Sequence, residues 1–216
     1  MRPKLLQVVS CEQVAAATVI HDRYMPQWAA SDRALDYLAK GLPGFGDSAA
    51  LVKAAAVDRL YYARHEHLVE SAHRIAGVML APPADPIALV EAIAPLDHDA
   101  GTSCYWSFTS KFVHFFVALE GTPIFDEWAV RTLRHHFGRL TWVGRTVYRA
   151  FAEYALALRE STGPCCSVRG LDRYLWLSGM LRGWHANRRV PISREVRSVF
   201  ESPDPEVQRE AQRLLG

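Results

Sequence analysis

Residues 107–133 read SFTSKFVHFFVALEGTPIFDEWAVRTL and predict two helices joined by an extended return. The first part is rich in apolar residues and is expected to be helical over about 107–119. Gly121 supplies a helix stop, and Pro123 forces the residue before it away from helical angles. Asp126 then opens the next amphipathic run, as a helix N-cap residue does.

The rest of the chain also carries helix signals. Ser10 begins a capping box, and the Asp85-Pro86 pair starts another helix. The segment 51–80, LVKAAAVDRLYYARHEHLVESAHRIAGVML, has apolar residues every three or four positions and predicts one long helix. The segment 95–103, PLDHDAGTS, is expected to be a loop.

These patterns predict a compact all-α fold, because no segment alternates with period two between hairpin turns. The chain is expected to form a single helical domain over residues 1–216. That domain is expected to contain two lobes, about 1–100 and 101–216, with a cleft between them.

Composition limits the class of protein. Half of the 216 residues are hydrophobic and 22% are charged, as in ordinary globular proteins. No apolar run reaches the roughly 18 to 20 residues that a membrane span needs, and the N-terminus lacks a secretion signal. The sequence therefore predicts a cytoplasmic protein, expected to be a monomer, with no membrane partner.

The four cysteines show no metal-ligand spacing, and all four are interpreted as reduced thiols. The sequence therefore predicts no iron–sulfur cluster, no other metal and no cofactor. The cysteines are Cys11, Cys104, Cys165 and Cys166.

Positive charge is concentrated locally, although the formal net charge is only +2. Residues 129–150 contain five arginines and no acid, and residues 181–194 contain four arginines and no acid. Such stretches suit an anionic partner that contacts one face. Solvated arginines on the outside of helices give the same pattern.

Lys111 is one of only four lysines in a chain that otherwise uses arginine for positive charge. An amine can lose its proton and act as a nucleophile, which a guanidinium cannot do. The aromatic residues around it in sequence would favour the neutral amine by removing water. A lysine whose stem packs on aromatic rings while its amine reaches water is the alternative.

Asp126 can lie close to Lys111 if the chain returns after the first helix. A helix from Lys111 to Glu120 rises about 13 Å, and the extended segment to Asp126 can span about 17–20 Å. A lysine amine beside a carboxylate is a candidate Schiff-base site. A simple helix cap also explains Asp126.

The segment 107–133 resembles the Lys/Asp segment of helix–hairpin–helix DNA glycosylases, in particular the 8-oxoguanine glycosylase branch and its small bacterial relatives. In those proteins a Ser-Lys-aromatic-x-His-aromatic helix is followed by an extended Pro-Ile-x-Asp segment. The resemblance implies a protein that flips a damaged nucleotide out of double-stranded DNA. By the same resemblance, Lys111 would attack the sugar and Asp126 would be the catalytic carboxylate.

The chain departs from that family just before the lysine. A glycine-rich phosphate-binding hairpin is usual there, whereas this chain reads YWSFTSK. Thr109 and Ser110 are candidates to hold a phosphate instead. A glycine-rich stretch occurs earlier, GLPGFG at residues 41–46, as a helix-start loop or an auxiliary phosphate contact.

Further site residues are proposed from the resemblance, and each has an alternative as an ordinary core or surface residue. Trp176 is the preferred base-stacking residue, and Asp172 a candidate reader of a purine edge. The other candidates are Trp106, His114 and Phe115 for the lesion pocket, and Arg131, Arg134 and Arg145 for DNA phosphates.

The function expected from these observations is a lysine-dependent DNA glycosylase and abasic-site lyase that removes an oxidised purine such as 8-oxoguanine. The alternative is a non-catalytic nucleic-acid-binding or interaction protein with a glycosylase-like fold.

Overall fold

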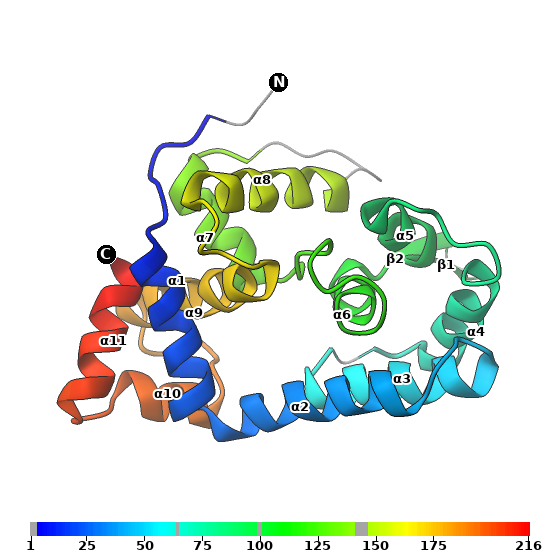
Figure 1. The fold of residues 1–216 in the computed structure, drawn as a ribbon, viewed down its shortest axis with the longest axis horizontal. Helices are drawn as coiled ribbons and strands as arrows, with labels where there is room; N and C mark the ends of the chain where they lie inside the picture. Colours follow the sequence, from blue (N-terminus) through cyan, green and yellow to red (C-terminus); the bar gives the residue numbers. More distant parts are fainter. Residues whose placement is uncertain (1–3, 64, 99–100, 141–146) are drawn as a thin grey trace. The chain divides into compact units, whose positions relative to one another are not determined.

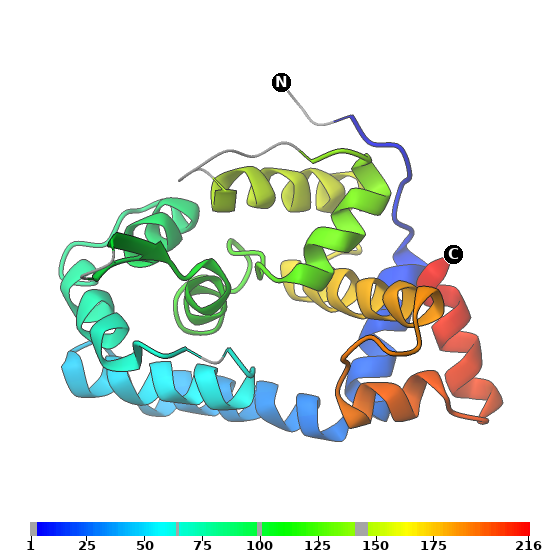
Figure 2. The same ribbon diagram turned by 180° about the vertical axis from the view of Figure 1, so that it is seen from behind.

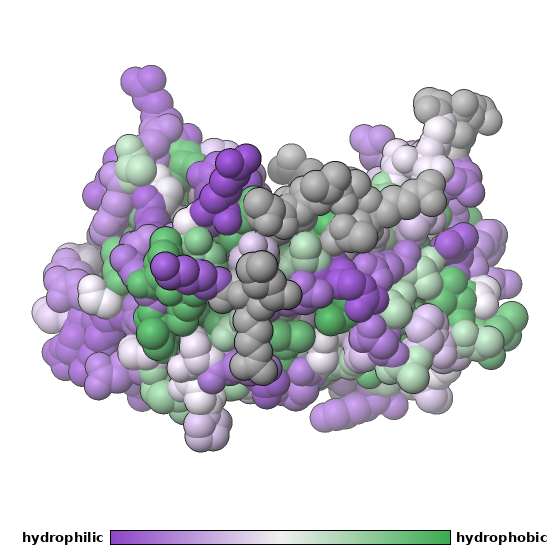
Figure 3. Space-filling model, turned by 90° about the horizontal axis from the view of Figure 1, so that it is seen from above, coloured by the Kyte–Doolittle hydropathy of each residue, from purple (hydrophilic) through white to green (hydrophobic). Residues whose placement is uncertain are grey.

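The computed structural model describes residues 4–63, 65–98, 101–140 and 147–216. Within these residues the protein is built from helices and one two-stranded sheet (Figure 1). The all-α class predicted from the sequence is confirmed. Among the described residues, no helix has the length and apolar character needed to cross a bilayer. Hydrophilic and hydrophobic residues are interspersed on the face seen in Figure 3.

The chain divides into two compact units, each made from separate stretches of sequence. Unit 1 comprises Met1–Ala30, Asp126–Thr141 and Glu153–Gly216. Unit 2 comprises Ser31–Phe125 and Trp142–Ala152. The sequence predicted lobes that divide near residue 100, whereas the N-terminal 30 residues belong with the C-terminal helices.

Unit 1 is organised around one long buried helix, α9, which packs against α1, α7 and α11. Two further helices, α2 and α8, have residues in both units. The helices of unit 1 are α1 (Cys11–Val19), the π-helix η1 (Ile20–Tyr24), the start of α2 (Pro26–Gly41), α7 (Glu127–Phe137), most of α8 (Val147–Thr162), α9 (Val168–Ala186), α10 (Arg194–Phe200) and α11 (Pro205–Leu215).

Gly179 permits the close approach of α9 to α7. A Cβ atom at this position would lie 2.3 Å from the carbonyl oxygen of Trp128 and 2.9 Å from Oγ1 of Thr132. The neighbouring Leu175 carbonyl accepts a hydrogen bond of 2.7 Å from Thr132 Oγ1. Any side chain at Gly179 would therefore have to push one helix backbone away from the other.

We expect Gly179→Ala to lower the free energy of unfolding by about 1–3 kcal/mol, the usual cost of overpacking a core. Gly77→Ala is the matched control, because Gly77 also lies in a helix but a Cβ there meets no atom within 4 Å. That control should raise stability by up to about 1 kcal/mol through helix propensity. Urea unfolding measures both, and equal effects of the two substitutions would contradict the packing argument.

Unit 2 surrounds helix α6 (Trp106–Phe116), whose residues from Phe108 to Phe115 are all buried. Figures 1 and 2 show α6 lying between the α3–α4 pair and α5, and α6 packs against α3 and α5. The remaining elements of unit 2 are α3 (Asp47–Leu60), α4 (Leu68–Val78), α5 (Pro86–Ile93), β1 (Pro95–His98) and β2 (Gly101–Cys104).

The single helix predicted over residues 51–80 is wrong, because α3 ends at Leu60 and α4 begins at Leu68. His65 lies between them, buried against the rings of Tyr105 and Phe108 at centroid distances of 4.4 and 4.3 Å. Its amide donates to the Asp58 carboxylate at 2.7 Å. The chain leaves the helical conformation between α3 and α4, because the His65 imidazole is buried against Tyr105 and Phe108.

The loop predicted over residues 95–103 is also incorrect, because β1 and β2 pair as antiparallel strands. Pro95 lies opposite Cys104 and Leu96 opposite Ser103. Each strand has only four residues, and β2 is mostly exposed, so the pair offers little alternation by which it could be predicted.

Two cysteines form a disulfide, which corrects the interpretation of all four as reduced thiols. Cys11, at the start of α1, is bonded to Cys165, in the loop between α8 and α9. Cys104 and Cys166 are not part of a disulfide. Cys11 and Cys165 are 154 residues apart, so only the packing of α1 on α9 brings them together.

Candidate functional site

Lys111 lies on the second turn of α6 and is buried, with 8% of its surface exposed. Its Nζ donates a hydrogen bond of 3.1 Å to Oγ of Ser107, one turn earlier. A helical side chain leans toward the preceding turn, which explains this contact. The amine is therefore held at the N-terminal end of α6.

The segment from Thr122 to Phe125 lies beside α6 and is fixed at three points. Nδ1 of His114 lies 2.8 Å from the carbonyl oxygen of Thr122, and the Tyr148 hydroxyl donates to the carbonyl oxygen of Pro123 at 2.9 Å. The amide of Phe125 donates to Oγ of Ser110 at 2.9 Å. The return of the chain predicted from the sequence is thus confirmed as far as Phe125.

Ser110 has a structural role in holding this return. Its side chain is fully buried, and its hydroxyl donates to the Ser107 carbonyl at 3.2 Å while accepting from Phe125. Thr109 is also buried, with 1% of its surface exposed. The side chains of Thr109 and Ser110 are therefore not among the phosphate contacts that we propose below.

Asp126 follows this segment directly and is the N-cap of α7, as the sequence predicted. Its Oδ1 accepts a hydrogen bond of 2.7 Å from the amide of Ala129. The amides at a helix N-terminus stabilise the ionised carboxylate. Asp126 belongs to unit 1 and Lys111 to unit 2.

Three candidate pocket residues belong to α6. Trp106 is half-buried and stacks on Tyr148, with a centroid distance of 6.3 Å. Phe115 is buried and contacts the ring of Tyr61 at 4.8 Å. His114 is buried, and because a carbonyl only accepts, its contact with Thr122 places the imidazole proton on Nδ1.

The other candidate pocket residues, Asp172 and Trp176, lie on α9 in unit 1. Asp172 is buried, whereas Trp176 is half-buried and contacts Trp28 at a centroid distance of 4.6 Å. Asp172 and Trp176 therefore belong to one unit, whereas Trp106, His114 and Phe115 belong to the other.

The candidate phosphate-binding arginines on α7 are exposed. The Arg131 guanidinium lies 4.6 Å from the Trp128 ring and forms an ion pair with Glu127. Arg134 points from the same helix and has no ion pair within the described part of the chain. Arg145, the third candidate, lies outside the described residues.

Lys53 is a deeply buried lysine that the sequence analysis missed. Only 1% of its surface is exposed, and Nζ donates to the Gly44 carbonyl at 2.7 Å. Nζ also lies 4.0 Å from the Phe45 ring and 5.4 Å from the Phe116 ring. Burial lowers the pKa of the Lys53 amine. Phe116, assigned from the sequence to the surroundings of Lys111, thus contacts Lys53.

The helical pattern of α3 contained a signal for this burial. Lys53 shares one face of the helix with Ala50, Ala54 and Val57, all of which are buried. Small residues allow close helix packing, so their face is the more deeply buried one.

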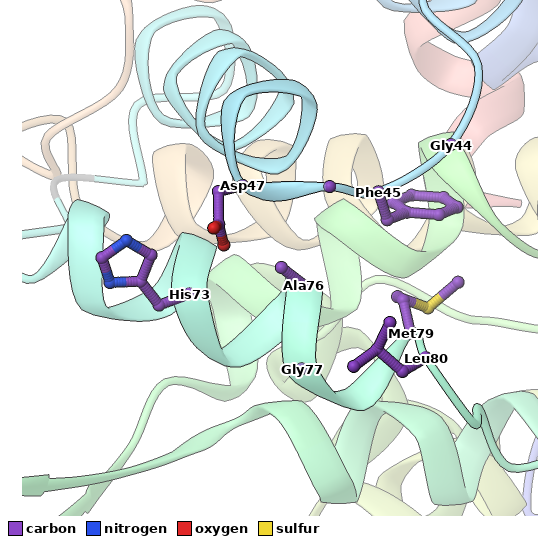
Figure 4. A pocket seen from close by; sticks show the side chains of 9 residues that line it. Gly44, Phe45, Asp47, His73, Ala76, Gly77, Met79 and Leu80 are labelled. Carbon is purple, nitrogen blue, oxygen red and sulfur yellow. The ribbon is translucent and has the colours of Figure 1, made fainter.

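The loop that Lys53 holds borders a hollow of 510 Å³ between the start of α3 and α4. Figure 4 shows Asp47 and His73 at one end of this hollow, with Phe45, Met79 and Leu80 at the other. Because Asp47 places an acid at the first position of α3, this hollow is a poor match for the auxiliary phosphate contact considered at residues 41–46.

His136, on α7, forms a second buried polar group that the sequence pattern did not reveal. Only 1% of its surface is exposed, Nδ1 lies 2.8 Å from the Gln7 carbonyl oxygen and Nε2 lies 2.8 Å from the Tyr174 hydroxyl. Burial lowers the pKa of His136 to about 4, so the imidazole is neutral at pH 7. Burial also favours the neutral form of Tyr174, and it therefore raises the pKa of the Tyr174 hydroxyl.

Comparisons with protein-family models, curated proteins and solved structures found no match. Among the described residues, no group of three or more His, Cys, Asp or Glu side chains is placed to hold a metal ion.

Proposed function

We propose that this protein is a lysine-dependent DNA glycosylase and abasic-site lyase acting on an oxidised purine such as 8-oxoguanine in damaged double-stranded DNA. The observation that carries the proposal is the anchoring of the return segment. Ser110 precedes Lys111 and holds Phe125, which precedes Asp126. The resemblance of residues 107–133 to the glycosylase segment supplies the roles of the amine and the carboxylate.

In the proposed reaction, Nζ of Lys111 forms a bond to C1′ of the sugar while the bond from C1′ to the base breaks, and the base leaves with a proton. The C1′–O4′ bond of the sugar then breaks, the remaining amine proton moves to O4′, and C1′ and Nζ form a Schiff base. Loss of a C2′ proton then breaks the C3′–O bond, which cuts the strand. Asp126 stabilises the positive charge that develops on the sugar.

The partner in this proposal is damaged double-stranded DNA, and the proposed location is the cytoplasm. The candidate phosphate contacts are Arg131, Arg134 and Arg145, because one guanidinium can donate two parallel hydrogen bonds to the oxygens of a phosphate. Trp106 and Trp176 are the candidate stacking residues for an extruded base.

Borohydride trapping tests the proposal, because reduction of a Schiff base leaves a permanent protein–DNA adduct. We expect the wild type to form an adduct with duplexes that carry 8-oxoguanine or an abasic site. Lys111→Gln should abolish the adduct, and Asp126→Asn should slow its formation with the 8-oxoguanine duplex. Lys40→Gln is the matched control, since Lys40 is an exposed lysine in the last turn of α2.

The proposal fails if the wild type gives no adduct with any duplex in a panel of oxidised, deaminated and abasic lesions. Duplex binding that persists without an adduct, and is the same in Lys111→Gln and Asp126→Asn, would favour a non-catalytic DNA-binding protein. An adduct that persists in Lys111→Gln would place the nucleophile elsewhere, with Lys53 the next amine to test.

A further inference from the structure

A basic surface in unit 1 takes no part in the site described above. From Arg182 to Glu201 the chain has five arginines and two glutamates, a formal charge of +3, whereas the whole chain carries +2. Four of these arginines are exposed in the loop after α9 and on α10, and they define the α9–α10 surface: Arg188, Arg189, Arg194 and Arg197.

Trp184 holds two of these arginines close together. Its side chain is 3% exposed, and the guanidinium carbons of Arg188 and Arg197 lie 5.0 and 5.3 Å from its ring. Each distance is within the range of a cation–π contact. One buried indole therefore positions two exposed positive charges that come from different elements of the chain.

The charges of the α9–α10 surface are not neutralised by neighbouring acids. Within the described part of the chain, none of its four arginines forms an ion pair with a carboxylate. Glu195, although next to Arg194, accepts a hydrogen bond of 2.9 Å from the Gln27 amide instead. Neighbouring like charges repel, and an anion bound between them would remove that repulsion.

A hollow of 520 Å³ lies within this surface. Two arginines line it together with one acid, and the lining residues are Ile192, Arg194, Arg197, Ser198 and Glu201. Guanidinium groups bind phosphate oxygens in a planar, two-pronged geometry. Glu201 opposes an anion at one side of the hollow, so its removal should strengthen anion binding.

The α9–α10 surface lacks the apolar anchor of a typical protein–protein interface. None of the exposed large hydrophobic residues found in the described chain lies between residues 181 and 201. Protein interfaces have an apolar, charge-depleted core, whereas interfaces with DNA are polar and strongly positive. These observations favour a phosphodiester backbone over an acidic protein as the partner.

We propose that the α9–α10 surface binds the sugar–phosphate backbone of duplex DNA, with Trp184 positioning Arg188 and Arg197 against the phosphates. This inference deepens the proposed function and rests on it, because it adds a backbone contact independent of any lesion.

The test is the salt dependence of binding to an undamaged fluorescent duplex, measured by anisotropy. Each phosphate contact adds about 0.9 to the slope of log affinity against log salt. The double variant Arg188→Gln/Arg197→Gln should therefore reduce the magnitude of that slope by about 1.8. When the salt concentration rises from about 50 mM to about 200 mM, the wild type should then lose about twelvefold more affinity than the variant loses. Glu201→Gln should increase affinity.

The matched control is Arg59→Gln/Arg209→Gln, which removes two exposed arginines from other helices and should not change the slope. The inference is overturned if the Arg188/Arg197 variant, folded by circular dichroism, has the wild-type slope, or if the wild type does not bind the duplex. An unchanged slope with weaker binding to poly-L-glutamate would point to an acidic protein partner instead.

Borohydride trapping of the wild type, run in parallel, separates this inference from the proposed function. A reduced slope in the variant without any wild-type adduct would support the backbone contact and reject the glycosylase. A wild-type adduct with an unchanged slope in the variant would support the glycosylase and reject the backbone contact.

Discussion

Reduction of the Cys11–Cys165 disulfide is expected to lower the free energy of unfolding by about 5 kcal/mol. The bond closes a loop of 154 residues, and cross-linking so long a loop removes much of the entropy of the unfolded chain. Urea unfolding with and without dithiothreitol measures the difference. The double variant Cys11→Ser/Cys165→Ser should match the reduced wild type and should not respond to the reductant.

Cys166→Ser and Cys104→Ser are the controls for the disulfide. Cys166 is the immediate neighbour of Cys165, but it is buried and takes no part in the disulfide. Cys104, in unit 2, takes no part in it either. Both variants should keep the disulfide and its stabilising effect. Four free thiols in the oxidised wild type, or loss of the disulfide in Cys166→Ser, would contradict the assigned pairing.

Mild acid is expected to destabilise the protein through His136. Burial lowers the pKa of this imidazole to about 4 in the folded state, whereas the unfolded chain takes up a proton near pH 6.5. The unfolded state therefore binds more protons between these values, and stability falls as the pH decreases from about 6.5 to about 4. A shift of this size corresponds to about 3 kcal/mol.

The pKa values of His65 and His135 are also lowered by burial, so their titration acts in the same direction. His136→Gln isolates the part due to His136. It should lower stability at pH 7, because the contacts with Gln7 and Tyr174 change, but it should show less loss between pH 6.5 and 4.5. His73→Gln, at an exposed position on α4, should keep the wild-type pH dependence. Parallel pH curves for the wild type and His136→Gln would refute the assignment.

Local signals in the sequence predicted the helix termini well. The capping box at Ser10 and the caps at Asp85 and Asp126 form as expected, because each depends only on hydrogen bonds within a few residues. The return after α6 was also predictable, since glycine and proline restrict the backbone directly.

Features that depend on distant contacts were not predictable in the same way. The sequence interpretation carried one helix across residues 61–67, yet His65 packs on the Phe108 ring of α6 and the chain leaves the helix there. The lysine nearest to a cluster of aromatic residues in sequence is Lys111, but Phe45 and Phe116 meet in space around Lys53.

The return of the chain beside the candidate site was predicted, but the contact that anchors it was not. The sequence indicated Lys111, Asp126 and the turn of the chain between them. It did not indicate that Ser110 would be used to hold Phe125, since a serine before a lysine is equally consistent with a phosphate contact. The hydrogen-bond partner of a buried hydroxyl depends on which buried N–H and C=O groups the rest of the fold leaves to be satisfied.

The disulfide also makes a covalent ring of the chain between Cys11 and Cys165. Residues 31–125, the larger stretch of unit 2, lie wholly inside that ring. A protease that cuts once anywhere in this stretch therefore leaves the two fragments joined, and the nicked protein behaves as one molecule until a reductant separates them.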